Sequence, residues 1–188
     1  IDPKIPPVDL LAGNYEEVLN GHKSSRSKAS EIENAIKHHI KINIDDDPEY
    51  YKNLSERLED IIKKYDEKWD ELVQLLLNLR ENIESDRKQQ ADDLGLTQTE
   101  LAFYNILLAE VGGNETPSQE SQTQIKDVVQ SLVSMLDEAT QIVGFFEKWD
   151  EQRRVKRDIK RVIIKNFDES LVKPITERFM DLAETKYK

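Results

Sequence analysis

Apolar side chains recur at every third or fourth position along most of this chain. That spacing places them on one face of an α-helix, whereas a half-buried strand would alternate apolar and polar residues. The pattern is clearest over residues 49–94, where neither Gly nor Pro occurs. We therefore predict a single helix of about ten turns or more there, as the long central helix of a bundle.

Helix-start and helix-stop signals divide the rest of the chain. Asp47-Pro48 combines an N-cap aspartate with a proline at the first helical position, and Gly95 is typical of a helix C-terminus. Thr97 and Glu100 have the spacing of a capping box. The predicted fold class is all-α, a multi-helix bundle of six to seven helices with no strand. The remaining predicted helices cover residues 28–42, 100–111, 122–146, 149–164 and 169–187.

The first 23 residues differ in composition from the rest. Residues 1–7 contain three prolines, which fix φ and remove backbone donors, so this segment is expected to be extended. Residues 8–19 favour a short helix. We therefore interpret residues 1–23 as a linker and short helix from a preceding domain, and residues 24–188 as one C-terminal helical domain.

Composition excludes several classes of protein and site. The chain has no Cys, so neither a disulfide nor a thiolate metal site can form. No apolar run approaches the roughly 20 residues that span a bilayer, so we expect a cytoplasmic protein without membrane contact. The net charge of −11 repels nucleic acid at long range, which makes the chain as a whole a poor non-specific DNA binder.

No pattern of catalytic or cofactor-binding residues is present. Neither the phosphate loop Gly-x-x-x-x-Gly-Lys nor the dinucleotide motif Gly-x-Gly-x-x-Gly occurs. The acidic residues from Asp45 onward have the spacing of a calcium loop, but its sixth position is Tyr50, where a sharp turn needs glycine. Adjacent His38 and His39 point about 100° apart on a helix and cannot simply share a metal. We predict no catalytic residue, no metal site and no cofactor in this chain.

One basic cluster contrasts with the acidic background. It occupies the polar face of the predicted helix that begins at residue 149. Three interpretations are open: contact with DNA phosphates, contact with an acidic protein partner, or pairing with acidic residues of the same fold such as Glu56, Glu59 and Asp60. The cluster, which we name the basic cluster, consists of Arg153, Arg154, Lys156, Arg157, Lys160, Arg161 and Lys165.

Aromatic residues gather in two segments that are otherwise rich in apolar side chains. We expect them in the core rather than in a ligand site, because Phe and Trp supply large buried area to a bundle built from Leu, Ile and Val. They are Phe103, Tyr104, Phe145, Phe146 and Trp149.

A series of short segments carries a resemblance to a known family. His39-Ile40 ends a helix, Asp47-Pro48 breaks the chain, Tyr50-Tyr51 follows, and Ser55-Glu56-Arg57-Leu58 continues a new helix. Residues 102–104 and the basic-aliphatic run over residues 157–161 extend the match to roughly residues 25–188. In this order the segments resemble the C-terminal helical region of the DNA-translocating restriction (R) subunit of type I restriction–modification enzymes.

The resemblance implies a role in assembly. An R subunit carries a nuclease domain, two helicase-like ATPase domains and a C-terminal helical region, and the whole subunit would use ATP and Mg²⁺. The implied partners are the methylase and specificity subunits and the preceding helicase-like domains, and the implied task is docking without catalysis by this fragment. The alternative is a helical module that contacts duplex DNA beside the motor through residues 153–165. A self-associating bundle is a third hypothesis.

Overall fold

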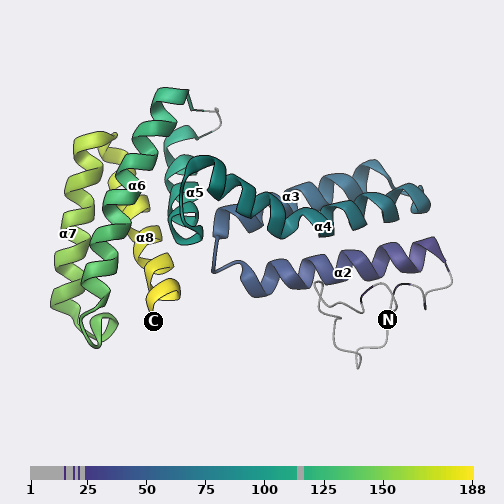
Figure 1. Ribbon diagram of the computed structural model, residues 1–188, viewed down its shortest axis with the longest axis horizontal. Helices are drawn as coiled ribbons and strands as arrows, with labels where there is room; N and C mark the ends of the chain where they lie inside the picture. The colour runs from purple at the N-terminus through teal and green to yellow at the C-terminus, as the bar shows by residue number, and fades with distance from the viewer. Residues whose placement is uncertain (1–14, 16–18, 20, 22–23, 114–116) are drawn as a thin grey trace. The chain divides into compact units, whose positions relative to one another are not determined.

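The computed structural model describes residues 15, 19 and 21, residues 24–113 and residues 117–188. These residues form seven α-helices and no strand, which confirms the predicted all-α class and the number of helices. The predicted linker and short helix over residues 1–23 lie almost entirely outside the described residues. The helices are α2 (Ser25–Asn43), α3 (Pro48–Lys64), α4 (Trp69–Leu94), α5 (Gln98–Gly112), α6 (Gln119–Thr140), α7 (Trp149–Asn166) and α8 (Val172–Tyr187), with 3-10 turns η1 (Phe145–Glu147) and η2 (Glu169–Leu171) (Figure 1).

The chain divides into two compact units. The first contains residues 1–44 and 50–89, and the second contains residues 45–49 and 90–188. Each unit is therefore built from two separate stretches of chain. The predicted domain boundary between residues 23 and 24 stays a prediction. None of the helices in the described part of the chain is long and apolar enough to cross a membrane.

The single long helix predicted over residues 49–94 is wrong. The structure has α3 and α4 instead, separated by residues 65–68, and Glu67 in this connection has a φ of 66°. The Lys68 N–H donates to the Tyr65 carbonyl across the break. A left-handed residue is normally Gly or Asn, so a glutamate there leaves no sign of the break in the sequence. The two helices form a hairpin rather than one rod.

The first unit buries one apolar face from each of α2, α3 and α4. α2 begins at Ser25 because the Ser24 hydroxyl accepts a hydrogen bond from the Ser27 N–H and caps the helix. The spacing of apolar residues by three or four positions, which predicted a helix over residues 28–42, places four of them in the core of this unit. These are Ile32, Ala35, Ile36 and Ile40, and all four are buried.

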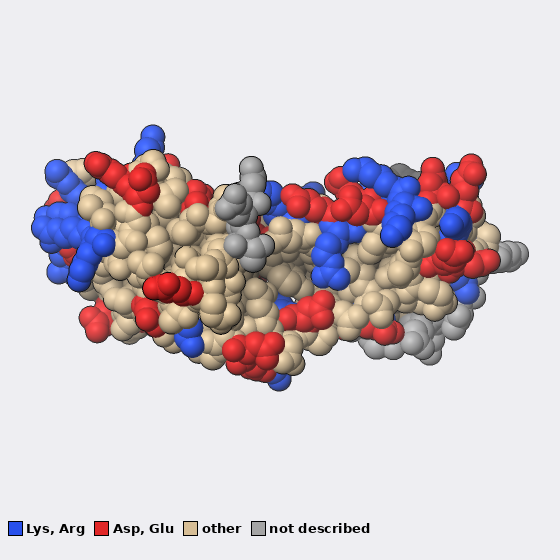
Figure 2. Space-filling model, turned by 90° about the horizontal axis from the view of Figure 1, so that it is seen from above, with Lys and Arg blue, Asp and Glu red and all other residues tan. Residues whose placement is uncertain are grey.

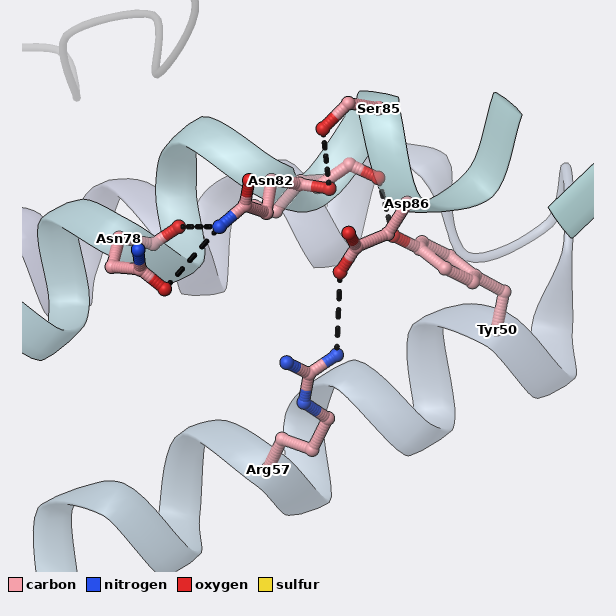
Figure 3. A network of polar contacts seen from close by, with 7 residues as sticks. Tyr50, Arg57, Asn78, Asn82, Ser85 and Asp86 are labelled. Atoms are coloured by element: carbon pink, nitrogen blue, oxygen red, sulfur yellow. Dashed lines mark hydrogen bonds and ion pairs between the residues drawn. The ribbon is translucent and has the colours of Figure 1, made fainter. Parts of the chain in front are cut away.

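Polar contacts join α3 to α4 along the hairpin (Figure 3). The Tyr50 hydroxyl, near the start of α3, donates to the Ile83 carbonyl on α4. Burial raises the pKa of Tyr50 to about 12, and the nearby Asp86 carboxylate adds to the shift. Arg57 lies 3.7 Å from Asp86, but both side chains are about half exposed and such pairs contribute about 0–1 kcal/mol. The hydrogen bond of the partly buried Tyr50 phenol is therefore the stronger contact between the two helices.

The second unit is a bundle of α5, α6, α7 and α8. α5 packs on α6 and α8, and α7 packs on the same two helices, so the four enclose one core. The rings of Phe103 and Phe179 meet edge to face at a centroid distance of 5.0 Å inside it. The predicted capping box at the start of α5 is confirmed, because the Glu100 N–H donates to the Thr97 hydroxyl and the Thr97 N–H to the Glu100 carboxylate. Gly95 has a φ of 61°, as its predicted role as a helix stop requires.

The corner between α6 and α7 differs from the prediction. The helix predicted over residues 122–146 ends at Thr140, and Gly144 turns the chain with a φ of 69° before η1. The apolar spacing continues through this corner because Phe145 is buried in the same core as α6. The prediction from apolar periodicity alone therefore placed the end of this helix too late in the chain.

Candidate functional site

Helix α7 carries the basic cluster and fixes its direction. Val155, Ile159 and Ile163 of α7 are buried against the other helices of the bundle, so the opposite side of α7 faces outward. Asp150 and Glu151 lie in the first turn, where acidic residues favour the helix dipole. The cations begin only after this turn and continue to the end of the helix. Seven Lys and Arg on α7 stand against three Asp and Glu, while the whole chain has a net charge of −11.

All seven side chains of the basic cluster are exposed, and Figure 2 shows Lys and Arg gathered over α7 at the left of the view. Two of the cations are paired on their own helix. Arg154 Nη2 lies 3.0 Å from Glu151 Oε2, and Arg161 Nη1 lies 3.2 Å from Asp158 Oδ1. The other five make no ion pair with another described residue of the second unit. These are Arg153, Lys156, Arg157, Lys160 and Lys165.

The acidic residues considered as internal partners of the basic cluster lie in the first unit, whereas α7 lies in the second. Glu56, Glu59 and Asp60 all lie on α3. Glu59 pairs there with Lys63 at 3.5 Å. Their pairing with the basic cluster stays a prediction, whereas within the second unit most of the cluster is unneutralised.

Trp149 is exposed, so its predicted place in the core is wrong. Its side chain has an exposed fraction of 68%, whereas Phe103, Tyr104 and Phe145 are buried as predicted and Phe146 is half-buried. Trp149 is the first residue of α7 and lies about 80° around the helix from Ile159, the centre of the buried stripe. The prediction grouped Trp149 with the neighbouring Phe residues and did not consider its angle relative to the buried stripe of α7.

Trp149 continues the exposed face of α7. The Arg153 guanidinium stacks over its indole at 5.0 Å from the ring centroid. Trp149, Arg153, Lys160 and Ile164 lie within about 60° of one another around the helix. Ile164 has an exposed fraction of 55%, and Val143, in the turn before α7, has one of 90%. We name the line from Trp149 through Arg153, Lys156, Arg157 and Lys160 to Ile164 the α7 strip.

A second polar cluster lies within the second unit and was not predicted. Arg178 on α8 donates to Glu110 on α5 at 2.8 Å and also to Glu49 in the first turn of α3. We name these three residues the Arg178 clasp. Beside it, the Asn105 amide lies 3.3 Å from both carboxylate oxygens of Asp47, and both residues are buried. These contacts bind residues 45–49 to α5 and α8.

The Arg178 clasp is built for structure rather than for a ligand. Burial disfavours the Arg178 cation, but hydrogen bonds to Glu110 and Glu49 outweigh that effect and raise the pKa of Arg178. A cavity of about 140 Å³ adjoins the guanidinium, but two carboxylates already engage it. Among the described residues, no group of three or more His, Asp or Glu could hold a metal ion. Sequence separations of 68 and 129 residues explain why no local motif signals the clasp.

Comparison with known proteins identifies the family. The family model for the C-terminal part of proteins like the type I restriction enzyme HindI endonuclease subunit matches residues 1–188. A Methanocaldococcus jannaschii protein named as the type I restriction enzyme MjaIXP endonuclease subunit is 26% identical over 153 residues. The match covers 79% of this chain and 14% of that protein, so the chain spans about one seventh of its relative. No solved structure matches. The match to the family model confirms the resemblance carried by residues 39–58: this chain belongs to the family of type I restriction enzyme endonuclease subunits and corresponds to their C-terminal region.

Proposed function

We propose that this chain is the module that docks the ATP-dependent translocase and endonuclease subunit of a type I restriction enzyme onto its methylase and specificity subunits. The observation that carries the proposal is the outward face of α7, where five exposed cations make no ion pair with another described residue of the second unit. An acidic partner surface would neutralise them. Such complementarity steers encounter and sets orientation more than it adds affinity.

The arrangement of charge on α7 supports a surface kept for a partner. Arg153 and Arg157, Lys156 and Lys160, and Arg157 and Arg161 are like-charged pairs four residues apart. Each pair disfavours the isolated helix by about 0.2–0.5 kcal/mol. An acidic surface laid over α7 relieves these repulsions together, so partner binding and helix stability act in the same direction.

In this proposal the fragment contributes assembly and no chemistry. ATP and Mg²⁺ would serve the helicase-like and nuclease domains of the whole subunit. The preceding helicase-like domains are then the second proposed neighbour of this chain. Purified alone, the chain should neither hydrolyse ATP nor cleave DNA.

Co-elution tests the docking proposal. We expect the chain to elute from gel filtration together with the matching methylase–specificity core. The variant Arg157→Glu/Lys160→Glu should lose this co-elution, because it places two carboxylates opposite an acidic surface. Lys41→Glu/Lys52→Glu is the matched control, since it makes the same charge change at exposed positions on α2 and α3. If the core never co-elutes with the folded chain, or if the α7 variant co-elutes as well as the control, the proposal is wrong.

The same unneutralised cations favour a second candidate function, contact with duplex DNA beside the motor. Four of them, spaced along one helix, could follow a phosphate backbone. The net charge of −11 acts against this candidate by repelling DNA at a distance. A salt titration separates the two candidates. Binding that uses four phosphates should weaken with a log–log slope of about −3.6, whereas a partly apolar protein contact should respond less steeply.

A further inference from the structure

Three large apolar side chains are exposed on α7 or in the turn that leads into it. Val143, Trp149 and Ile164 have exposed fractions of 90%, 68% and 55%. Only two other large hydrophobic side chains of the described residues, Ile42 and Ile44, are comparably open. A single exposed apolar residue is ordinary on a protein surface. Three that flank the unneutralised cations of one helix make a mixed surface, apolar at its ends and positive between them.

Trp149 and Arg153 form a preorganised anchor within this surface. The guanidinium stacks on the indole at 5.0 Å, so each side chain restricts the rotamers of the other before any partner arrives. Association then costs less side-chain entropy than it would with two free side chains. Arg153 makes no ion pair with another described residue of the second unit, which leaves its donors available for a carboxylate. Trp and Arg are also the residues that most often dominate the energy of protein interfaces.

We infer that the α7 strip binds an acidic amphipathic helix of the partner, here the methylase–specificity core. Trp149 and Ile164 are 15 residues apart, or about 22 Å along the helix axis, which corresponds to about four turns of a partner helix. That helix presents carboxylates to Arg153, Arg157 and Lys160, and apolar side chains to Trp149 and Ile164 at the two ends. The inference rests on the proposed docking function and specifies the chemistry of the partner.

The apolar ends of the strip distinguish a protein partner from DNA. A phosphate backbone offers no apolar surface to Ile164, which would stay in contact with water in a DNA complex. A partner helix with apolar positions removes both Trp149 and Ile164 from water. The Arg153 guanidinium and a carboxylate can also form two parallel hydrogen bonds, a geometry that positions the partner in register.

The test observes Trp149 directly in the complex. The chain contains two Trp, so labelling it with 5-fluorotryptophan gives two fluorine resonances, and the variant Trp149→Phe assigns them. The unlabelled methylase–specificity core is the first probe, and a duplex DNA of random sequence is the second. We expect the core to shift the Trp149 resonance and to leave that of Trp69 unchanged. Trp149→Ala should weaken binding of the core by about tenfold or more, as expected for an interface anchor.

Arg154→Gln is the matched control for Arg157→Gln and Lys160→Gln, because Arg154 is already paired with Glu151. Replacing Arg157 or Lys160 should weaken binding of the core more than replacing Arg154 does.

If the core co-elutes but the Trp149 resonance does not shift and Trp149→Ala binds normally, this inference is wrong and the docking proposal stands. If the core does not bind, both fail. If DNA shifts the Trp149 resonance and the core does not, the occupant of the α7 strip is DNA and the inference is wrong. If raising the concentration of the chain alone shifts it, the occupant is a second copy of the chain and the inference is also wrong.

Discussion

Replacing Arg178 with methionine removes both arms of the Arg178 clasp at once. The methionine keeps much of the aliphatic volume of the side chain, so packing on α8 changes little. What is lost is the cation between Glu49 and Glu110. Two carboxylates that shared one guanidinium then face each other without it.

The expected loss follows from the exposure of the three side chains. Arg178, Glu49 and Glu110 have exposed fractions of 29%, 13% and 21%. Breaking a fully buried ion pair costs about 3–5 kcal/mol, whereas a solvent-exposed pair contributes about 0–1 kcal/mol. The clasp lies between these limits, so we expect the free energy of unfolding to fall by about 2–3 kcal/mol.

Acidification should restore part of this loss. Without the guanidinium, the carboxylates of Glu49 and Glu110 repel each other in the folded variant, and acid relieves this repulsion. The folded variant therefore gains stability relative to the unfolded chain as pH falls. The difference from the original chain should therefore be smaller at about pH 5 than at about pH 7.

Urea unfolding followed by circular dichroism measures the loss, and amide hydrogen exchange over α8 assigns it to the second unit. Arg154→Met is the control, because Arg154 is exposed and paired only within its own helix. A loss from Arg178→Met no larger than that from Arg154→Met would refute the reasoning. A loss that is the same at both pH values would refute the part that concerns the two carboxylates.

Three further predictions concern single side chains. Thr97→Ala removes the cap of α5 and should lower the free energy of unfolding by about 1 kcal/mol, as measured by urea unfolding, with Thr99→Ala as the control. Glu67→Gly should raise the free energy of unfolding by up to about 1 kcal/mol, since glycine adopts the left-handed conformation without strain. Thermal unfolding measures this change, and a lower free energy of unfolding in the variant would contradict that account. Tyr50 has a pKa raised from 10.0 to about 12, so the stability contributed by its neutral phenol is complete below pH 10 and is lost as pH rises towards 12. Ultraviolet titration of the chain and of Tyr50→Phe should show one phenol that ionises about two pH units above the ordinary value, and ionisation near pH 10 would contradict the partial burial of Tyr50.

Apolar periodicity predicted the helices that line the core, because burial of one face is what holds them. The stripe on α2 and the buried Val155, Ile159 and Ile163 of α7 follow directly from the spacing. The outward direction of the basic cluster follows from the same spacing, since the face opposite a buried stripe is exposed. These features depend only on residues within one helix.

Three features of the structure could not be predicted from the apolar spacing. The break between α3 and α4 depends on the left-handed backbone conformation of Glu67, and glutamate has no local preference for that conformation. Trp149 is hydrophobic and follows the buried Phe145 by four residues, yet its angle on α7 leaves it exposed. Arg178 gains its role from Glu49, 129 residues earlier in the chain. In each case the type of residue was known from the sequence, but its conformation or its contacts in the fold were not.

The placement of residues 45–49 has a consequence for the order of folding during synthesis. The stretches on either side of this segment belong to the first unit, which can be complete once residue 89 has left the ribosome. The segment itself must wait, because Asn105 follows Asp47 by 58 residues and Arg178 follows Glu49 by 129. Chains fold from the N-terminus as they emerge, so we expect this loop to be open to proteases until α8 closes over it. A cut after residue 89 would leave the segment on the N-terminal fragment together with the complete first unit, and the C-terminal fragment would lack residues 45–49 of its own unit.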